Sequence, residues 1–377
     1  MTVSVREVDV VNQNDTGTCW MQAGLVYLSS MLKKKDEGKA PRFSSAYLAV
    51  FDKLGKAEAY LKQLRLPLDE RSLWHLSHDD PVKDGGTWPM FVHLVKTYGL
   101  VPHDAMPPTY QSEHTTGVNR YINMYLKSVA VAVRLKQITD AEVMAHVREA
   151  LLRSYGPLPE RISLHKKQHG VEYDGAPTGV VARILPSNAL DCVVLTHAPD
   201  RADGTYIGPY SNNPSLLKQN LFEVVGMDSL VRAVILQLRA GFAVWFSAEV
   251  RYDFSDKRGI AHVKLYDVGE ILDLPIADVN DKAARMKNGN TAPVHAMLLT
   301  AVKLDQDGAP VQWRIQNSWG KRQRDRGGFI TASHAWFAQH VFQVVVCRKY
   351  APVVPDATNA IALPFWDIFA TVALPVN

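Results

Sequence analysis

The sequence predicts an α+β protein in which a helical lobe precedes a sheet-rich lobe. Apolar residues recur at helical spacing in the N-terminal part, as in Met21, Leu25, Leu28 and Leu32. From about residue 231 the pattern changes to β-branched and aromatic runs separated by Asp-Gly and Gly-Gly turns. Helical elements followed by strands favour two packed lobes of the α+β class.

Helix signals are strongest in four segments. The first begins at Cys19 and is expected to run to Lys35, since three lysines suit its C-terminal dipole and Gly38 lies just beyond. The most regular pattern has Asp140 and Glu142 in its first turn, before an apolar face. The predicted helices are 19–35, 44–64, 88–98 and 137–153.

Strands are expected mainly in the C-terminal half. Residues 155–225 are rich in Pro, Gly and Asn and are predicted to be loop-heavy, with short strands. Longer strands are predicted within 241–250, 295–304, 310–319, 327–333 and 341–350. We therefore expect a helical lobe (1–125), a helical and loop-rich insertion (126–230), an antiparallel sheet-rich lobe (231–350) and a C-terminal tail (351–377).

The composition excludes several classes of protein. Hydrophobic residues make up 47% and charged residues 21% of the 377 residues, which is typical of a globular enzyme and excludes a disordered or fibrous chain. The net charge of +4 is too small to indicate a nucleic-acid partner. Three cysteines cannot form a disulfide framework, and no signal peptide or membrane span is evident, so a cytoplasmic location is expected.

Cys19 is the first candidate for chemistry. It follows the polar stretch Asn-Asp-Thr-Gly-Thr and opens the first predicted helix. A cysteine attacks as the thiolate, and the positive end of a helix dipole favours that form. A buried structural thiol is the alternative, and for an isolated cysteine it is the more common one.

The distant residues His295 and Asn317 supply the context that favours a nucleophile. An imidazole can take the proton of the thiol, and an amide oxygen can fix the orientation of the imidazole ring without adding charge. Trp319 could shield that contact from water. The side-chain amide of Gln13 and the backbone N–H of Cys19 could stabilise an oxyanion.

These motifs resemble those of papain-like cysteine peptidases, and within them the bleomycin hydrolase and aminopeptidase C group. The resemblance is carried by NQNDTGTCW (12–20), DGGTWPMFVHLVKTYGLVP (84–102), HAM (295–297), WRIQNSWG (313–320) and LPFWD (363–367). The His295 to Cys19 separation of 276 residues exceeds the roughly 130 to 150 of a minimal pair of papain-type lobes. Insertions of that size are a feature of this group.

The resemblance implies roles for individual residues. Cys19 would be the nucleophile, His295 the base and acid, Asn317 the orienting residue and Gln13 an oxyanion donor. Gly85 and Gly86 match a glycine pair that hydrogen-bonds an extended peptide substrate, although a tight turn is the simpler interpretation of Asp-Gly-Gly alone. Trp319 is assigned to the same substrate-binding region, while Asp84 and Trp88 are expected to be scaffold.

The resemblance also implies partners and regulation. The substrates would be peptides, no cofactor or metal would be needed, and the C-terminal tail would limit the cleft so that the enzyme acts as an aminopeptidase. Relatives form homohexamers, but only eighteen residues precede Cys19 here, so a hexamer is expected only if other contacts suffice. Two alternatives stay open: an amide or peptidyl transferase, and an inactive papain-fold scaffold protein.

Overall fold

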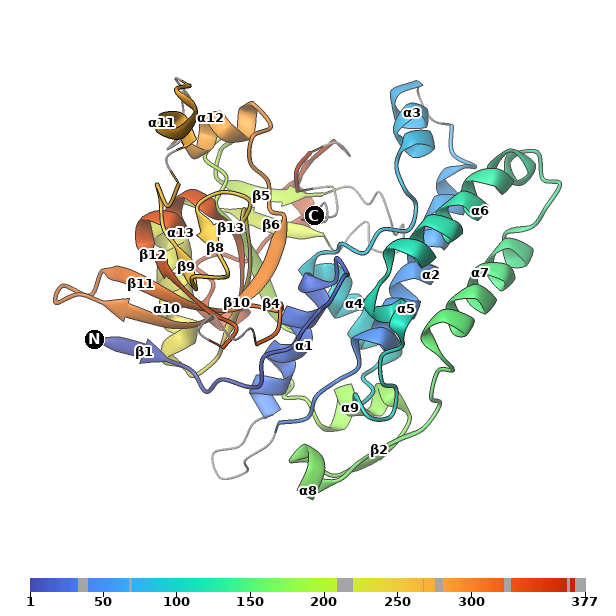
Figure 1. Ribbon diagram of the computed structural model, residues 1–377, viewed down its shortest axis with the longest axis horizontal. Helices are drawn as coiled ribbons and strands as arrows, with labels where there is room; N and C mark the ends of the chain where they lie inside the picture. Colours follow the sequence, from blue (N-terminus) through green and yellow to red (C-terminus); the bar gives the residue numbers. More distant parts are fainter. Residues whose placement is uncertain are drawn as a thin grey trace.

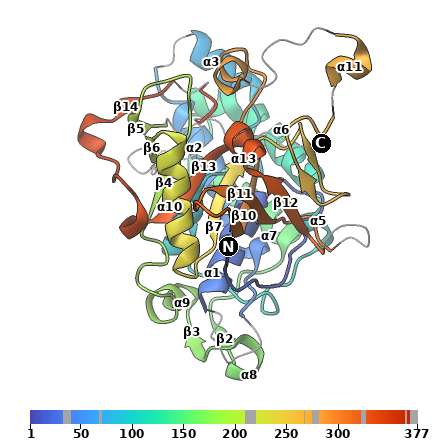
Figure 2. The ribbon, with the colours of Figure 1, turned by 90° about the vertical axis from the view of Figure 1, so that its left-hand side faces the viewer.

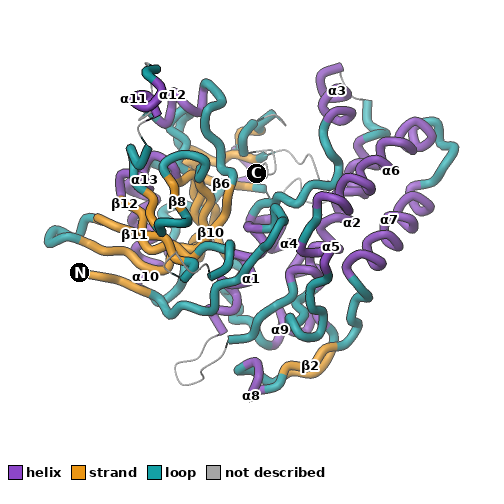
Figure 3. Tube along the Cα trace, viewed as in Figure 1, coloured by secondary structure: helices purple, strands orange, loops and turns teal. Residues whose placement is uncertain are grey.

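The computed structural model describes residues 1–32, 40–67, 70–208, 220–266, 268–274, 281–321, 327–364 and 367–369. Within these residues the helices that precede residue 184 gather on one side of the molecule, while the large sheet and the helices after residue 226 lie on the other (Figures 1 and 3). The predicted α+β class with two lobes is therefore confirmed. Lys33–Lys35, Gly38 and most of the charged run 321–326 fall outside the described residues.

The helical lobe is built around α1, which lies between the sheet and the other helices (Figure 1). Nearly every side chain of α1 is buried, including Leu25 and Leu28, so the helix forms the wall between the two lobes. The helices are α1 (Cys19–Leu32), α2 (Ser45–Gln63), α3 (Glu70–His78), α4 (Trp88–Tyr98), α5 (Tyr110–Glu113), α6 (Thr116–Arg134), α7 (Asp140–Tyr155), α8 (Lys166–His169), α9 (Pro177–Arg183), α10 (Met227–Arg239), α11 (Val268–Leu272), α12 (Lys282–Lys287) and α13 (His334–His340).

Local capping explains where several helices begin. The hydroxyl of Ser44 accepts a hydrogen bond from the backbone N–H of Tyr47 at the start of α2. Thr139 and Glu142 form a capping box at the start of α7, with both reciprocal bonds present. The helix predicted over 88–98 agrees with α4, and the one predicted over 137–153 begins three residues later because Thr139 caps it.

The large sheet is mixed. In the described part of the chain its strands follow the order β14-β5-β6-β4-β13-β7-β10-β11-β12-β9-β8, and β1 pairs with β10. The strands are β1 (Thr2–Ser4), β2 (Ile162–Leu164), β3 (Tyr173–Gly175), β4 (Cys192–Thr196), β5 (Gly204–Ile207), β6 (Leu221–Val224), β7 (Val244–Ala248), β8 (Phe254–Ser255), β9 (Ile260–Ala261), β10 (His295–Leu304), β11 (Pro310–Gln316), β12 (Phe329–Ser333), β13 (Val341–Cys347) and β14 (Ile361–Ala362). The small pair β2–β3 is separate.

Three pairs of strands in the sheet are parallel, and one of them, β9–β12, lies within the lobe (231–350) for which we predicted an antiparallel sheet. The pairs β4–β6, β9–β12 and β5–β14 are parallel, whereas the central pairs β7–β10, β10–β11 and β7–β13 are antiparallel. Of these parallel pairs, β4–β6 lies within the loop-heavy region, β9–β12 lies within the sheet-rich lobe, and β5–β14 joins the predicted insertion to the C-terminal tail. Helix α6 spans residue 125 and helix α10 spans residue 230, the two ends expected for the insertion.

Two of the longer helices, α6 and α10, were not predicted from the pattern. Helix α10 buries Leu230, Val234 and Leu238, which are four residues apart, but it crosses residue 231, where we expected the strand-rich region to begin. In the side view (Figure 2), α10 packs along the sheet face. Helix α6 buries Ile122, Leu126 and Val133 among exposed residues, so the helix rests on a narrow apolar stripe.

Candidate active site

The site lies where the first turn of α1 faces the end of β7 and the beginning of β10. Cys19 is the first residue of α1, and the carbonyl of Thr18 accepts from the backbone N–H groups of Met21 and Gln22. The indole N–H of Trp245 on β7 donates to the carbonyl oxygen of Trp20 across the lobe boundary at 3.0 Å. This bond fixes the beginning of α1 against the sheet (Figure 1).

His295 and Asn317 come together on neighbouring strands. His295 opens β10, and Asn317 follows the end of β11, which pairs with β10 in antiparallel fashion. The Nε2 atom of His295 lies 2.8 Å from Asn317 Oδ1. Because an amide oxygen only accepts hydrogen bonds, Nε2 carries the proton and Nδ1 remains the free basic nitrogen. The same Oδ1 accepts from the backbone N–H of Ser318 at 2.8 Å.

Cys19 and His295 line one small cavity of about 30 Å³. Gly86, Thr87, Trp245 and Phe369 also contribute to its wall. The backbone N–H of Ala296, the residue after His295, hydrogen-bonds to the sulfur of Cys19. The structure thus brings together the two residues that are 276 positions apart in the sequence.

Burial keeps both groups neutral when each is considered alone. Cys19 is 5% exposed and His295 is 3% exposed. Burial raises the pKa of the Cys19 thiol to about 11, although the hydrogen bond from Ala296 lowers it. Burial also lowers the pKa of His295 to about 4, against the opposing effect of Asn317. The helix end, which we expected to favour the thiolate, therefore does not ionise the thiol by itself, because loss of water outweighs the dipole.

Gln13 is held on two sides. Its side-chain carbonyl accepts from the hydroxyl of Ser318 at 2.6 Å, and its side-chain N–H₂ donates to the carbonyl oxygen of Thr16 at 2.6 Å. An amide N–H₂ has two protons, so one remains available to another acceptor. The backbone N–H of Gln13 also donates to the Ser318 carbonyl at 2.7 Å, which links the loop before Cys19 to the loop after β11.

The glycine pair and Trp319 occupy different surroundings. Gly86 lines the cavity, and a Cβ atom there would lie 2.3 Å from the ring of Trp20, so glycine is required by the scaffold as well as by any substrate. The Gly85 carbonyl accepts from the Lys56 ammonium group at 2.7 Å. The Trp319 ring lies 4.7 Å from the His295 ring and covers it, but it is not among the described residues that line the cavity.

Two hydroxyl groups in the cavity wall have no hydrogen-bond partner within the described chain. They are Thr87 Oγ1 and Ser247 Oγ, and both atoms are buried. A buried hydroxyl without a hydrogen-bond partner destabilises the folded protein. These two atoms therefore mark positions where a polar group of a bound molecule would form a hydrogen bond. The described residues contain no cluster of three or more His, Cys, Asp or Glu that could hold a metal ion.

The C-terminal segment reaches the same cavity. Ile368 and Phe369 line it, and Phe369 packs against Phe222 and Phe342 with ring centroids 5.4 and 5.9 Å away. Before them, the Asp367 carboxylate accepts from the Arg201 guanidinium at 3.0 Å. Arg201 was not identified from the sequence, since it lies in the loop-heavy region, where no pattern singles it out.

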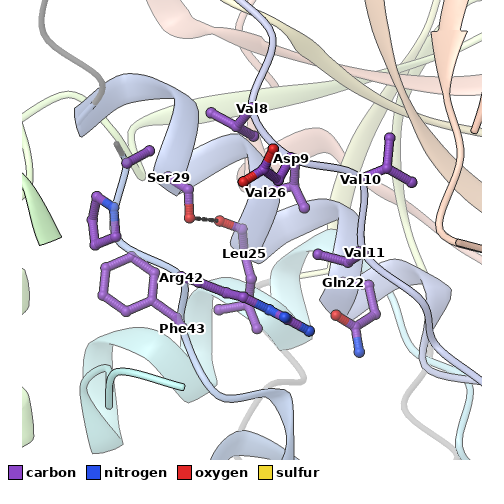
Figure 4. A pocket seen from close by; sticks show the side chains of 12 residues that line it. Val8, Asp9, Val10, Val11, Gln22, Leu25, Val26, Ser29, Arg42 and Phe43 are labelled. Atoms are coloured by element: carbon purple, nitrogen blue, oxygen red, sulfur yellow. Dashed lines mark hydrogen bonds between the residues drawn. The ribbon is translucent and has the colours of Figure 1, made fainter. Parts of the chain in front are cut away.

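A second, larger cavity of about 220 Å³ lies on another face of α1. Its wall is formed by Val8–Val11, by residues of α1 such as Leu25, and by residues 40–43 (Figure 4). The hydroxyl of Ser29 in this wall turns back to the Leu25 carbonyl at 2.9 Å. None of the residues predicted for the site lines this cavity, so the smaller cavity is the candidate site.

The fold, the cavity shared by Cys19 and His295, and the bond between His295 and Asn317 define the class of protein as a papain-like cysteine peptidase. A model of the Peptidase C1-like family matches residues 1–370, and the chain belongs to this family. It is 32% identical to aminopeptidase E of Lactobacillus helveticus over 96% of this chain and 86% of that protein. It is 28% identical to bleomycin hydrolase of Homo sapiens, covering 97% and 86% of the two chains. These findings confirm the resemblance seen in the sequence.

A solved structure agrees over nearly the whole chain. The crystal structure of pepw from Lactobacillus rhamnosis has a TM-score of 0.88 at 27% identity, covering 98% of this chain and 88% of the other. The protein is thus a cysteine peptidase with the architecture of that structure. As for a membrane, none of the helices in the described ranges combines the length and the hydrophobicity needed to cross one.

Proposed function

We propose that the protein is a cysteine aminopeptidase that hydrolyses peptide bonds through a thioester on Cys19. The observation that carries this proposal is that Cys19 and His295 share one cavity while Asn317 occupies the Nε2 atom of His295. Only Nδ1 is then free to exchange a proton with the thiol. The relatives whose names include aminopeptidase support the choice of peptide N-termini as substrates.

The reaction would proceed in two halves. His295 Nδ1 takes the thiol proton, and the sulfur attacks the peptide carbonyl carbon to give a tetrahedral oxyanion. The second amide proton of Gln13 and the backbone N–H of Cys19 stabilise that oxyanion. The C–N bond breaks as the imidazolium gives its proton to the leaving amine. Water, deprotonated by His295, then attacks the thioester and releases the acid and the free thiol.

The pKa values of Cys19 and His295 are consistent with direct transfer of a proton from the thiol to the imidazole. A lone thiolate and a lone imidazolium are both opposed by burial, which raises the Cys19 pKa and lowers the His295 pKa. Transfer of one proton from sulfur to nitrogen creates both charges together and leaves the site's net charge unchanged. The attraction between these two opposite charges is strong in a buried site and offsets part of the cost of their lost hydration.

The C-terminal segment would restrict the cleft. Because Ile368 and Phe369 occupy part of the cavity wall, a long peptide cannot extend on both sides of Cys19 there. Arg201 holds the segment by its ion pair with Asp367, and its guanidinium lies 5.1 Å from the Phe369 ring centroid. Such a block favours substrates that end at the cleft, which is the behaviour of an exopeptidase.

We also propose a cytoplasmic homohexamer. The three cysteines are free, and Cys192 and Cys347 face each other across β4 and β13 without a disulfide, as expected in a reducing compartment. The hexamer rests on the family resemblance. Light scattering coupled to size exclusion should then give six times the 42.0 kDa chain mass. The mass of a single chain at micromolar concentration would rule the hexamer out.

The function is tested with a panel of fluorogenic peptides. Free and N-acetylated versions of each peptide are compared for the wild type and for Cys19→Ala. We expect turnover of the free peptides by the wild type, little turnover of the acetylated ones, and none by Cys19→Ala. An epoxysuccinyl inhibitor should label Cys19, as identified by mass mapping, and should fail to label it after His295→Ala. Efficient release of an N-terminal residue by Cys19→Ala would overturn the assignment.

A further inference from the structure

A cluster of buried charged residues lies next to the site on the helical side. Lys53 Nζ is 2.6 Å from Asp84 Oδ1, and the two side chains are 1% and 11% exposed. Lys56 and Asp52 form a second buried pair at 2.6 Å. Ionic groups are rarely buried without a function or a network to satisfy them, so the cluster calls for an explanation.

Asp84 lies at the centre of the cluster. Its Oδ1 accepts from Lys53 and from the Asn119 side chain at 2.8 Å. Its Oδ2 accepts from the Thr115 hydroxyl and from the backbone N–H of Gly17 at 3.0 Å. The Asp84 backbone carbonyl accepts from the indole N–H of Trp20 at 2.8 Å. One carboxylate thus ties α2 and α6 to the loop that precedes Cys19.

The bond to Gly17 leads directly to Gln13. Thr16 and Gly17 share one planar peptide group, whose carbonyl oxygen accepts from the Gln13 side chain at 2.6 Å. The N–H of the same group donates to Asp84. The peptide group is therefore clamped between an amide on one side and a carboxylate on the other. A carboxylate acceptor polarises the group and strengthens the carbonyl as an acceptor for Gln13.

The packing requires glycine at position 17. A Cβ atom there would lie 2.9 Å from the Cβ atom of Asp84, which is too close for a real contact.

The surroundings of Asp84 also keep its carboxylate charged. Burial opposes it, but the Lys53 ammonium group and the hydrogen bonds from Thr115 and Asn119 hold the pKa of Asp84 well below its usual range. The Asp84 carboxylate therefore stays ionised through the pH range in which an ordinary aspartate takes up a proton.

We propose that Asp84 is a positioning residue for the oxyanion donor Gln13, and that it acts through the Thr16–Gly17 peptide group. The proposal rests on the peptidase function above and deepens it. Asp84 touches neither substrate nor the reacting atoms. It fixes the peptide group to which one Gln13 proton is bonded, and so it aims the other proton at the position where the oxyanion forms.

The test is the Asp84→Asn variant, assayed for turnover and for alkylation. Loss of one oxyanion donor typically costs about 10²–10³ in kcat, so a misaimed donor should lower kcat by about 10- to 100-fold while KM changes less than about threefold. Alkylation of Cys19 by iodoacetamide forms an S–C bond and releases iodide without any oxyanion. Its rate, read at Cys19 by mass mapping, should stay within about threefold of wild type across pH.

Two further variants separate positioning from stability. Lys53→Met combined with Asp84→Asn removes the orphaned ammonium group, so it should restore Tm but not kcat. It also carries the test if the single variant does not fold. Asn123→Ala is the matched control, because Asn123 lies one turn from Asn119 on α6 and binds the backbone of Val82 at 2.8 Å without touching Asp84. It should lower Tm and leave kcat within about threefold, as expected of a structural contact.

The outcomes distinguish the proposal from its premise. A parallel fall of alkylation and kcat in Asp84→Asn would mean that the residue supports Cys19 itself, and the proposal would be wrong. Recovery of kcat in the double variant, or an equal loss of kcat in Asn123→Ala, would also overturn it. A wild-type protein that alkylates at Cys19 but turns over no peptide would instead refute the proposed function.

Discussion

The role of the C-terminal segment can be tested by replacing its anchor, Phe369. Its side chain is 4% exposed and contacts Phe222, Phe342 and the guanidinium of Arg201. Burial of a phenylalanine contributes about 2–3 kcal/mol. Phe369→Ala should therefore raise the fraction of undocked segment by about 30- to 150-fold, since about 1.4 kcal/mol corresponds to a factor of ten. Arg201→Ala, which removes a partly exposed ion pair and a cation–π contact, should have a smaller effect of roughly fivefold.

The assay compares an internally quenched peptide blocked at both ends with a free fluorogenic peptide. If only the undocked form admits a long chain, cleavage of the blocked peptide rises in proportion to the undocked fraction. Tyr121→Ala removes an exposed aromatic ring on α6, far from the segment in sequence, and should leave the ratio of the two activities unchanged. An unchanged ratio in Phe369→Ala, with Tm preserved, would refute the gating argument.

Three other predictions concern the centre of the site. Asn317→Ala removes the acceptor of His295 Nε2 and should lower kcat by about 10- to 100-fold with KM little changed, as measured by steady-state kinetics. Gly86→Ala brings a Cβ to 2.3 Å from Trp20 and should reduce kcat/KM at least about tenfold, whereas Gly117→Ala, with nothing within 4 Å, should not. Since the pKa of His295 is lowered to about 4 by burial, its contribution to stability is present above the unfolded pKa of about 6.5 and is lost as pH falls toward 4. Urea denaturation should show that the free energy of unfolding falls by about 2 kcal/mol less in His295→Gln than in the wild type when the pH is lowered from 7 to 4.5. An equal fall in the two proteins would contradict the stabilising effect assigned to neutral His295.

Much of the fold follows from local pattern. The strand predicted over 295–304 is β10 with the same bounds, and the helix over 88–98 is α4, because each carries a complete apolar pattern with its own start and stop signals. Helix α10 was missed because we placed the change to a sheet-rich pattern at about residue 231, inside the helix, although Leu230, Val234 and Leu238 recur at helical spacing.

The buried charges left a trace in the sequence that we did not use. In α2, Asp52, Lys53 and Lys56 occupy the same buried face as Ala49 and Tyr60. Charged residues at helical spacing within an apolar stripe indicate a buried ionic network, since a solvated face would lie opposite. That pattern indicates which helix carries the buried charges, but it does not indicate which residue elsewhere in the chain pairs with them. Asp84 follows a separate loop, and we therefore assigned it to the scaffold.

The sequence by itself supplied the candidates for the reacting groups: a cysteine at the start of a helix, a histidine at the start of a strand, and an asparagine after the next strand. These assignments depend on short-range patterns and on the identity of side chains. The tertiary structure alone decided that burial opposes ionisation of both Cys19 and His295, that Asp84 reaches the loop of Gln13, and that Phe369 lies in the same cavity. The physical reason is that solvation and distance depend on segments hundreds of residues apart, which meet only when the two lobes pack on α1.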